Sequence, residues 1–145
     1  MDLIKATPNK ERVKSILDMI ALVEDRINSL DKIKFTPLIL SDYYEIIKEL
    51  ITAVLLCDGF KTLSHKDLID YLKLNYPLIN SQEVELIDKL RILRNRISYE
   101  GFKIPSDYLA NNELIYKDII KKLKTLVNSK IKNKEGGYYA GKNKC

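Results

Sequence analysis

The sequence predicts an all-α fold: an antiparallel bundle of about five helices, with a four-helix up-and-down core and one shorter helix. Apolar residues recur at spacings of three and four along most of the chain, and alternating strand-like stretches are absent. The segments between the helical patterns are short, which favours antiparallel neighbours. With 145 residues, 46% of them hydrophobic, the chain is long enough for one domain and too short for two.

The first two expected helices are the ones with the most regular apolar stripes. Thr7, followed by a proline, is the expected N-cap of the first helix, whose stripe covers residues 13–30. The second helix is expected to begin near Pro37 or Ser41 and to run to Asp58. Its C-terminal half is apolar nearly all round, so we expect this helix to be central and the most buried.

Polar caps mark the third and fourth helices. Ser64 is expected to cap the shorter third helix, which ends at Tyr76 because the next residue is a proline. Asn80 or Ser81 is expected to cap the fourth helix. Both helices carry apolar residues on one face, which indicates that each packs on the core through that face.

Two glycines in the helical part of the chain predict helix ends. Gly59 and Gly101 each stand between an acidic residue and a phenylalanine, a setting typical of a left-handed stop at the end of a helix. The stops would end the second and fourth helices. The fifth helix is then expected to begin around Pro105 and to run to about Val127.

The positive charge of the chain is concentrated near its end. The formal net charge is +5, and residues 121–145 hold eight lysines against one acidic residue. We therefore divide the chain into a helical domain, residues 1–127, and a basic, disordered tail, residues 128–145. The tail is either a solvated, solubilising segment or a flexible arm that adds phosphate contacts.

Several classes of protein are excluded by what the sequence lacks. No apolar run approaches the ~18 residues of a membrane-spanning helix, and the first residues lack a signal-peptide pattern, so we expect a cytoplasmic protein with no membrane association. Cys57 and Cys145 are too few and too far apart in sequence to indicate a disulfide framework or a zinc site. With His65 as the only histidine and no glycine-rich phosphate loop, we expect no metal, no cofactor and no conventional hydrolase.

The strongest candidate for a functional site is the end of the fourth helix. Three of the five arginines, Arg91, Arg94 and Arg96, fall within six residues there. Arg91 and Arg94 are helical neighbours, and with Asn95 beside them they form a candidate phosphate site. The alternative is that acids of the second helix neutralise these arginines: Asp42, Glu45 or Glu49.

The segment Leu-Arg-Asn-Arg-Ile-Ser-Tyr-Glu-Gly-Phe, residues 93–102, and the tyrosine- and acid-containing helix of residues 41–50 resemble the HEPN family. Its members are small α-helical domains of prokaryotes and eukaryotes, often found with minimal nucleotidyltransferases. The resemblance covers roughly residues 8–127. It implies a homodimer whose two motifs meet across the interface, an RNA or nucleotide ligand, and a nucleotidyltransferase partner.

The ribonucleases of that family carry an arginine, four to six intervening residues and a histidine. By this resemblance Arg94 is the family arginine, Asn95 is the residue that commonly follows it, and Tyr99 occupies the histidine position. A phenol with a pKa of about 10 stays protonated at pH 7, unlike an imidazole. We therefore expect a degenerate ribonuclease motif that binds a nucleotide or RNA phosphate. The residues expected to line its groove are Arg91, Arg94, Asn95, Arg96, Tyr99, Asp42 and Glu45.

Two other functions stay open. The first is an active, toxin-like endoribonuclease that needs no metal, with Arg94 and either Tyr99 or His65 as catalytic residues. The second is a purely structural interaction protein, the helical half of a pair whose nucleotidyltransferase supplies the catalysis. In some family members that partner modifies a tyrosine close to the motif, and Tyr99 is the candidate acceptor here.

Overall fold

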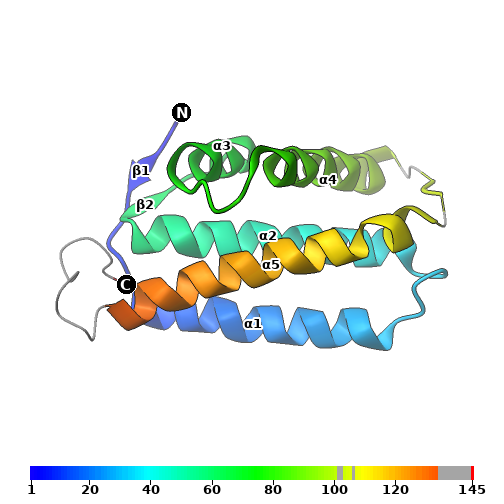
Figure 1. Cartoon of the computed structure of the whole chain (residues 1–145), viewed down its shortest axis with the longest axis horizontal. Helices are drawn as coiled ribbons and strands as arrows, with labels where there is room; N and C mark the ends of the chain where they lie inside the picture. The colour runs from blue at the N-terminus through cyan, green and yellow to red at the C-terminus, as the bar shows by residue number, and fades with distance from the viewer. Residues whose placement is uncertain (101–102, 106, 134–144) are drawn as a thin grey trace.

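The computed structural model describes residues 1–100, 103–105, 107–133 and 145, and the side chains of Tyr99, Glu100 and Asn133 fall outside this description. Within it, the predicted all-α bundle is confirmed (Figure 1). The helices are α1 (Lys10–Ser29), α2 (Thr36–Cys57), α3 (His65–Asn75), α4 (Ser81–Glu100) and α5 (Asp107–Asn133). A two-stranded antiparallel pair joins β1 (Ile4–Lys5) to β2 (Phe60–Lys61).

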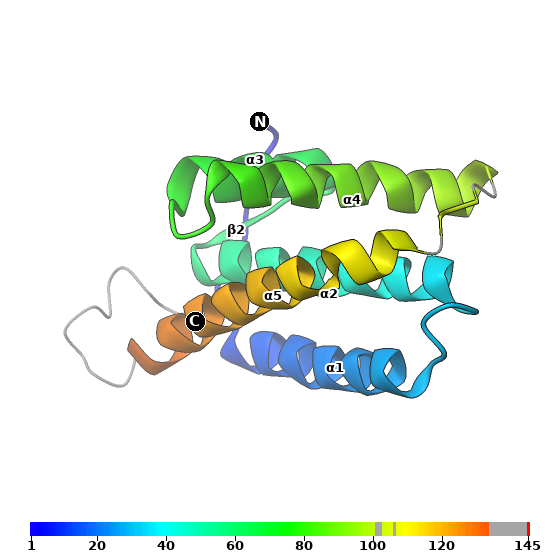
Figure 2. The ribbon, with the colours of Figure 1, turned by 45° about the vertical axis from the view of Figure 1, so that its right-hand side comes forward.

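The four long helices alternate in direction along the chain, and α2 lies between the others (Figure 1). α1 packs along one side of α2, α3 and α4 pack along the opposite side, and α5 crosses a third face (Figure 2). α5 runs in the same direction as α2, so the C-terminal ends of these two helices lie at the same end of the bundle. This is the predicted up-and-down core with one shorter helix, α3.

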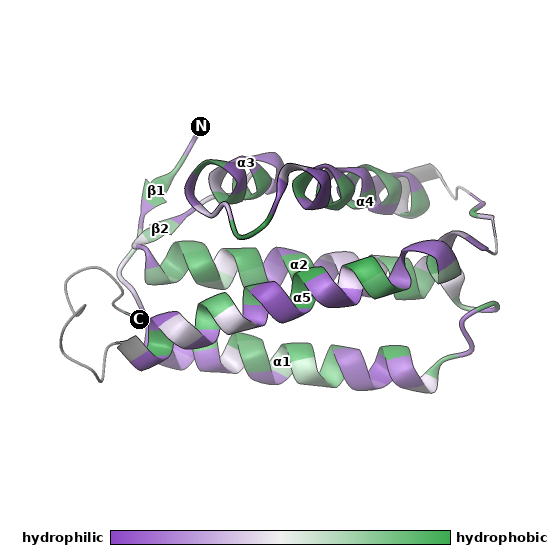
Figure 3. Cartoon of the chain, in the orientation of Figure 1, coloured by the Kyte–Doolittle hydropathy of each residue, from purple (hydrophilic) through white to green (hydrophobic). Residues whose placement is uncertain are grey.

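The central position of α2 follows from its composition. Fifteen of its 22 residues are buried, and it is the most uniformly apolar helix in the molecule (Figure 3). Ile39, Ile47 and Leu55 are fully buried although they point in different directions around the helix. Burying such a side chain contributes about 1.5–3 kcal/mol, so partners on several sides of α2 are strongly favoured.

Two predicted N-caps and one predicted glycine stop are confirmed. The Ser64 hydroxyl accepts a hydrogen bond from the backbone N–H of Asp67 at 3.2 Å. Asn80 and Glu83 form a reciprocal capping box, in which each side chain accepts from the other's backbone N–H at 2.8 and 3.0 Å. Gly59 ends α2 with a φ of +90°, a conformation that residues with a Cβ rarely adopt. The similar stop predicted at Gly101 lies outside the described residues.

The predicted N-cap of the first helix is wrong. α1 starts later than Thr7 and Pro8 suggested, and the Asn9 side chain caps it by accepting from the backbone N–H of Arg12 at 3.1 Å. The preceding residues are held extended by β1, and the Ala6 N–H donates to the carbonyl of Gly59 at 2.9 Å. Two-residue strands are too short to show an alternating pattern, so the sequence did not indicate them.

The predicted end of the fifth helix near Val127 is also wrong, since α5 continues to Asn133. Residues 128–133 therefore belong to the bundle, and residues 134–144 lie outside the described part of the chain. Three of the eight lysines among residues 121–145 form ion pairs with the body, and Lys130 is the one of them that lies in the predicted tail. These pairs are Lys122–Glu83 at 2.9 Å, Lys124–Glu24 at 2.5 Å and Lys130–Asp58 at 2.6 Å.

The two cysteines form a disulfide bond, contrary to the expectation from their spacing. Cys57 ends α2, and Cys145 lies beside it with 4.5 Å between the Cα atoms, although the two are separated by 88 positions in sequence. Both residues are buried. Disulfides are typical of oxidising compartments, with exceptions in the cytosol, so the expected cytoplasmic location stays a prediction.

A largely buried polar cluster connects the helices at the C-terminal end of α2, next to the disulfide. Asp58 accepts hydrogen bonds from the hydroxyls of Tyr71, at 2.7 Å, and Tyr76, and from the Lys130 ammonium at 2.6 Å. The Lys130 ammonium also lies 4.8 Å from the centre of the Tyr76 ring. Burial, followed by the hydrogen bond to Asp58, raises the pKa of both tyrosines, which stay neutral donors. One carboxylate thus joins α3 and α5 to the end of α2.

We expect Lys130→Ala to lower the free energy of unfolding by about 2–4 kcal/mol, because it leaves a largely buried carboxylate without its cation. Lys132→Ala is the matched control, since Lys132 is an exposed lysine of the same helix turn, and we expect a change below about 0.5 kcal/mol. Urea unfolding followed by circular dichroism measures both. Equal effects of the two substitutions would contradict a structural role for Lys130.

Candidate functional site

The least buried stripe of α2 lies between α1 and the α3–α4 pair. Leu38 is exposed, and Ser41, Glu45, Lys48 and Thr52 follow it at helical spacing, each half-buried. A groove of about 430 Å³ runs beside this stripe, between α2 and α1. The lining of the groove combines apolar side chains of α1 with acids of α2, including Glu45. Half-buried polar side chains of α2, such as Glu45, therefore border a groove that a ligand can enter.

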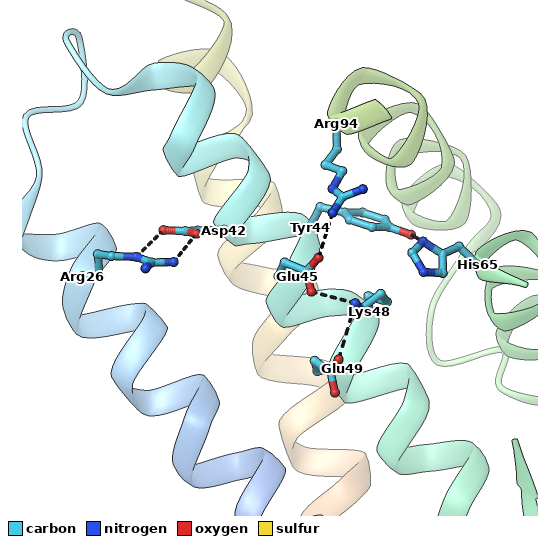
Figure 4. Close-up of polar contacts among 8 residues, drawn as sticks. All are labelled: Arg26, Asp42, Tyr44, Glu45, Lys48, Glu49, His65 and Arg94. Carbon is cyan, nitrogen blue, oxygen red and sulfur yellow. Dashed lines mark hydrogen bonds and ion pairs between the residues drawn. The ribbon is translucent and has the colours of Figure 1, made fainter. Parts of the chain in front are cut away.

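Arg94 reaches this stripe from α4 and meets Glu45 (Figure 4). The distance from Arg94 Nη2 to Glu45 Oε1 is 3.4 Å. The other oxygen of Glu45 lies 2.7 Å from Lys48 Nζ, which in turn lies 3.5 Å from Glu49. Two cations thus share one carboxylate. We call Arg91, Arg94, Glu45, Lys48, Tyr44 and His65 the Arg94 cluster.

Arg91 belongs to the cluster through its electrostatic effect rather than through an ion pair with α2. Its Nε donates to Asp88 of the same helix at 2.8 Å. Its charge nevertheless acts on Tyr44 and His65, as does that of Arg94. Arg91 and Arg94 therefore act on the same two side chains.

Tyr44 and His65 complete the cluster. The sequence indicated His65 only as an alternative catalytic residue, and it did not indicate Tyr44 or Lys48. The Tyr44 hydroxyl and His65 Nδ1 lie 3.1 Å apart, and the two rings are 5.9 Å apart between centroids. Burial raises the pKa of Tyr44 to about 12. Burial and then the Lys48 charge lower the pKa of His65, so the imidazole is neutral at pH 7. No described residue forms a hydrogen bond with His65 Nε2.

Of the other sequence-predicted site residues, Asp42 is on the wrong side of α2. Both of its carboxylate oxygens bind the guanidinium of Arg26 on α1, at 2.6 and 3.0 Å (Figure 4). It lines the groove but does not meet Arg94. Asn95 is half-buried, and Arg96 is exposed about 200° around α4 from Arg94. The backbone of Tyr99 lies in α4, whereas its side chain is outside the described groups.

The two ion pairs of α2 with arginine differ in strength. Arg26 binds Asp42 through two short hydrogen bonds, the bidentate geometry of a firmly held guanidinium. Arg94 makes one long contact of 3.4 Å with Glu45, and both side chains are partly exposed. Such a pair is worth about 0–1 kcal/mol. The alternative from the sequence, neutralisation by Glu45, therefore holds for Arg94 only in a weak and exchangeable form.

Other kinds of site have less support. Within the described residues, no group of three or more histidine, cysteine or acidic side chains is placed to hold a metal ion. None of the helices, over the residues described, is long and apolar enough to cross a membrane. The known proteins add nothing to these observations: no family model, no curated protein and no solved structure matches the chain.

The titration of His65 tests this geometry directly, because the chain has a single histidine. We expect an NMR titration midpoint below 6.5, and a higher midpoint in Lys48→Met, which removes the positive charge that lowers the His65 pKa most. Lys89→Met, an exposed lysine elsewhere on α4, should leave the midpoint unchanged.

The lowered pKa of His65 also predicts how the free energy of unfolding depends on pH. An unfolded chain binds the His65 proton more tightly than the folded one, so stability should fall as the pH drops from about 6.5 toward the folded pKa. A midpoint at or above 6.5 would place His65 away from the cations of the cluster.

Proposed function

We propose that the chain binds the phosphate of a nucleotide or RNA at the Arg94 cluster. The observation that carries this proposal is the weak, single contact between Arg94 and Glu45, with Arg91 and Lys48 close by. Guanidinium groups bind phosphate oxygens through paired, charge-assisted hydrogen bonds. A phosphate group therefore offers Arg94 a better partner than the one it has.

If a ligand displaces Glu45 from Arg94, neither Glu45 nor Arg94 is left as a buried charge without a partner. Glu45 keeps its 2.7 Å contact with Lys48, and the groove beside it lets the carboxylate stay solvated. The Arg94 side chain is 26% exposed, so its remaining N–H groups can reach a ligand without unfolding α4. The cost of opening the pair is thus about 0–1 kcal/mol, less than the 1.5–3 kcal/mol typical of a hydrogen bond to a charged group.

The resemblance to the HEPN family supports the same ligand class and extends the proposal to partners. We include in it a homodimer that brings two copies of Arg94 toward one cleft, and a nucleotidyltransferase as a second partner. Residues 91–96 would then be close to the dimer interface. Sedimentation velocity of the full chain tests the first of these features independently of any ligand.

We expect Arg94→Ala to weaken the binding of a short single-stranded RNA about five- to tenfold, and to reduce the dependence of binding on salt between about 50 and 200 mM. Fluorescence anisotropy with a labelled oligonucleotide measures both quantities. Lys89→Ala removes one charge from the opposite face of the same helix, where it pairs with Glu85, and serves as the control. Equal weakening by the two variants would indicate non-specific attraction, and the proposal would fail.

Metal-independent RNA cleavage is a second candidate, and the contact between His65 and Tyr44 favours it. With Nδ1–H donating to the Tyr44 oxygen, Nε2 carries the lone pair of a general base. That nitrogen would take the proton of a ribose 2′-hydroxyl, whose oxygen attacks phosphorus while the bond to the 5′-oxygen breaks and that oxygen takes a proton from water. Arg94 and Arg91 would stabilise the negative charge that develops on the phosphoryl oxygens.

RNA incubated with the protein in excess EDTA distinguishes cleavage from binding. In this candidate His65→Gln abolishes the appearance of 2′,3′-cyclic phosphate ends, and Tyr99→Phe leaves their rate within about twofold of the parent. If Tyr99→Phe alone abolishes cleavage, the base belongs to the motif tyrosine instead. Intact RNA in every reaction leaves phosphate binding as the function of the cluster.

A further inference from the structure

A second hollow opens at the seam between α1 and α5 and shares no residue with the Arg94 cluster. Its volume is about 400 Å³, within the range of small-molecule pockets. Ten residues line it, nearly all from these two helices, and α2 contributes Tyr43. The proposed phosphate site makes no use of any of them.

The hollow has an apolar floor. Ile27, Tyr43 and Ile120 lie at its base, and each is at most 4% exposed. The Tyr43 hydroxyl is satisfied by Glu113 at 2.6 Å, so the ring presents an apolar surface to the hollow rather than an unpaired polar group. An aromatic or aliphatic body would bury its surface against this floor.

The rim of the hollow is cationic. Lys117, Lys121 and Lys124 lie about one turn apart on α5, so the three lysines line the same side of the hollow. Glu24 is the single acid of the lining, and it lies 2.5 Å from Lys124. Among the described residues, neither Lys117 nor Lys121 forms an ion pair. Two lysines therefore border an apolar floor: Lys121 forms no ion pair with a described residue, and the charge of Lys117 also acts on Glu113, whose pKa it helps to lower.

Neutral hydrogen-bonding groups complete the wall. Asn28 on α1 and Thr125 and Asn128 on α5 also line the hollow, so two carboxamides and a hydroxyl belong to its wall. These groups can donate to or accept from a polar substituent on a ligand. Such a mixed wall above an apolar base is typical of a small-molecule site rather than of a flat electrostatic surface.

We propose that this hollow binds a small organic anion that has an apolar or aromatic body. The body would lie on Ile27, Tyr43 and Ile120, and the anionic group would lie between Lys117 and Lys121. The two lysines at the rim select the charge, and the buried floor selects the body. A polyanion such as RNA would use the lysines and leave the floor unfilled, so it fits the site less well.

The test uses 1-naphthyl phosphate as the probe, with inorganic phosphate and 1-naphthol as its two halves. Calorimetry and methyl NMR of the full chain measure binding and locate it. We expect the whole probe to bind at least about tenfold more tightly than either half, with the largest shifts at Ile27 and Ile120. We expect the double variant Lys117→Ala/Lys121→Ala to weaken binding about tenfold, and Lys132→Ala to leave it unchanged.

A steric variant and a cross-control complete the design. Thr125→Phe fills the hollow from an exposed position of α5 and should abolish binding while the circular dichroism spectrum stays that of the parent. Arg94→Ala should leave naphthyl phosphate binding unchanged, so the failure of one site is distinguishable from that of the other. The proposal is overturned if inorganic phosphate binds as tightly as 1-naphthyl phosphate, or if Lys132→Ala weakens binding as much as the double variant does. It is also overturned if the chemical-shift changes are confined to the Arg94 cluster.

Discussion

Fifteen of the 22 residues of α2 are buried, and the need to cover this helix on several sides determines where the other helices lie. One neighbouring helix cannot cover a helix that is apolar on several sides, so α1, α3, α4 and α5 all pack against α2. The polar ties follow the same geometry. Ion pairs connect the outer helices to α2 or to one another around it, with the Asp58 cluster and the disulfide at one end.

This arrangement explains why two different polar environments arise so close together in the chain. Tyr43 and Tyr44 are adjacent residues of α2, and helical geometry separates their side chains by about 100°. Tyr43 turns toward α5, where its hydroxyl meets Glu113, and Tyr44 turns toward α3, where it meets His65. α2 thus contributes the Tyr43 ring to the hollow between α1 and α5 and the Tyr44 hydroxyl to the Arg94 cluster. The core of the bundle separates these two sites.

The helical class, the central helix and most helix ends could be predicted, because apolar spacing and capping residues act over a few neighbouring positions. The sequence could not single out Glu45 as the partner of Arg94, because Asp42, Glu45 and Glu49 lie on the same helix and were equal alternatives. His65 could not be placed, because its position depends on how α3 packs beside α4. The pairing of Cys57 with Cys145 likewise depends on α2 and α5 ending together, which no local pattern records.

The bond between Cys57 and Cys145 closes a covalent ring that contains α3, α4 and α5 and leaves β1 and α1 outside it. A force applied between the first and last residues therefore stretches only the part of the chain before the bridge. Fully extended, the oxidised molecule reaches about 200 Å, against about 500 Å once the bond is reduced. The redox state of a single bond thus sets how far residues 1 and 145 can be pulled apart under tension.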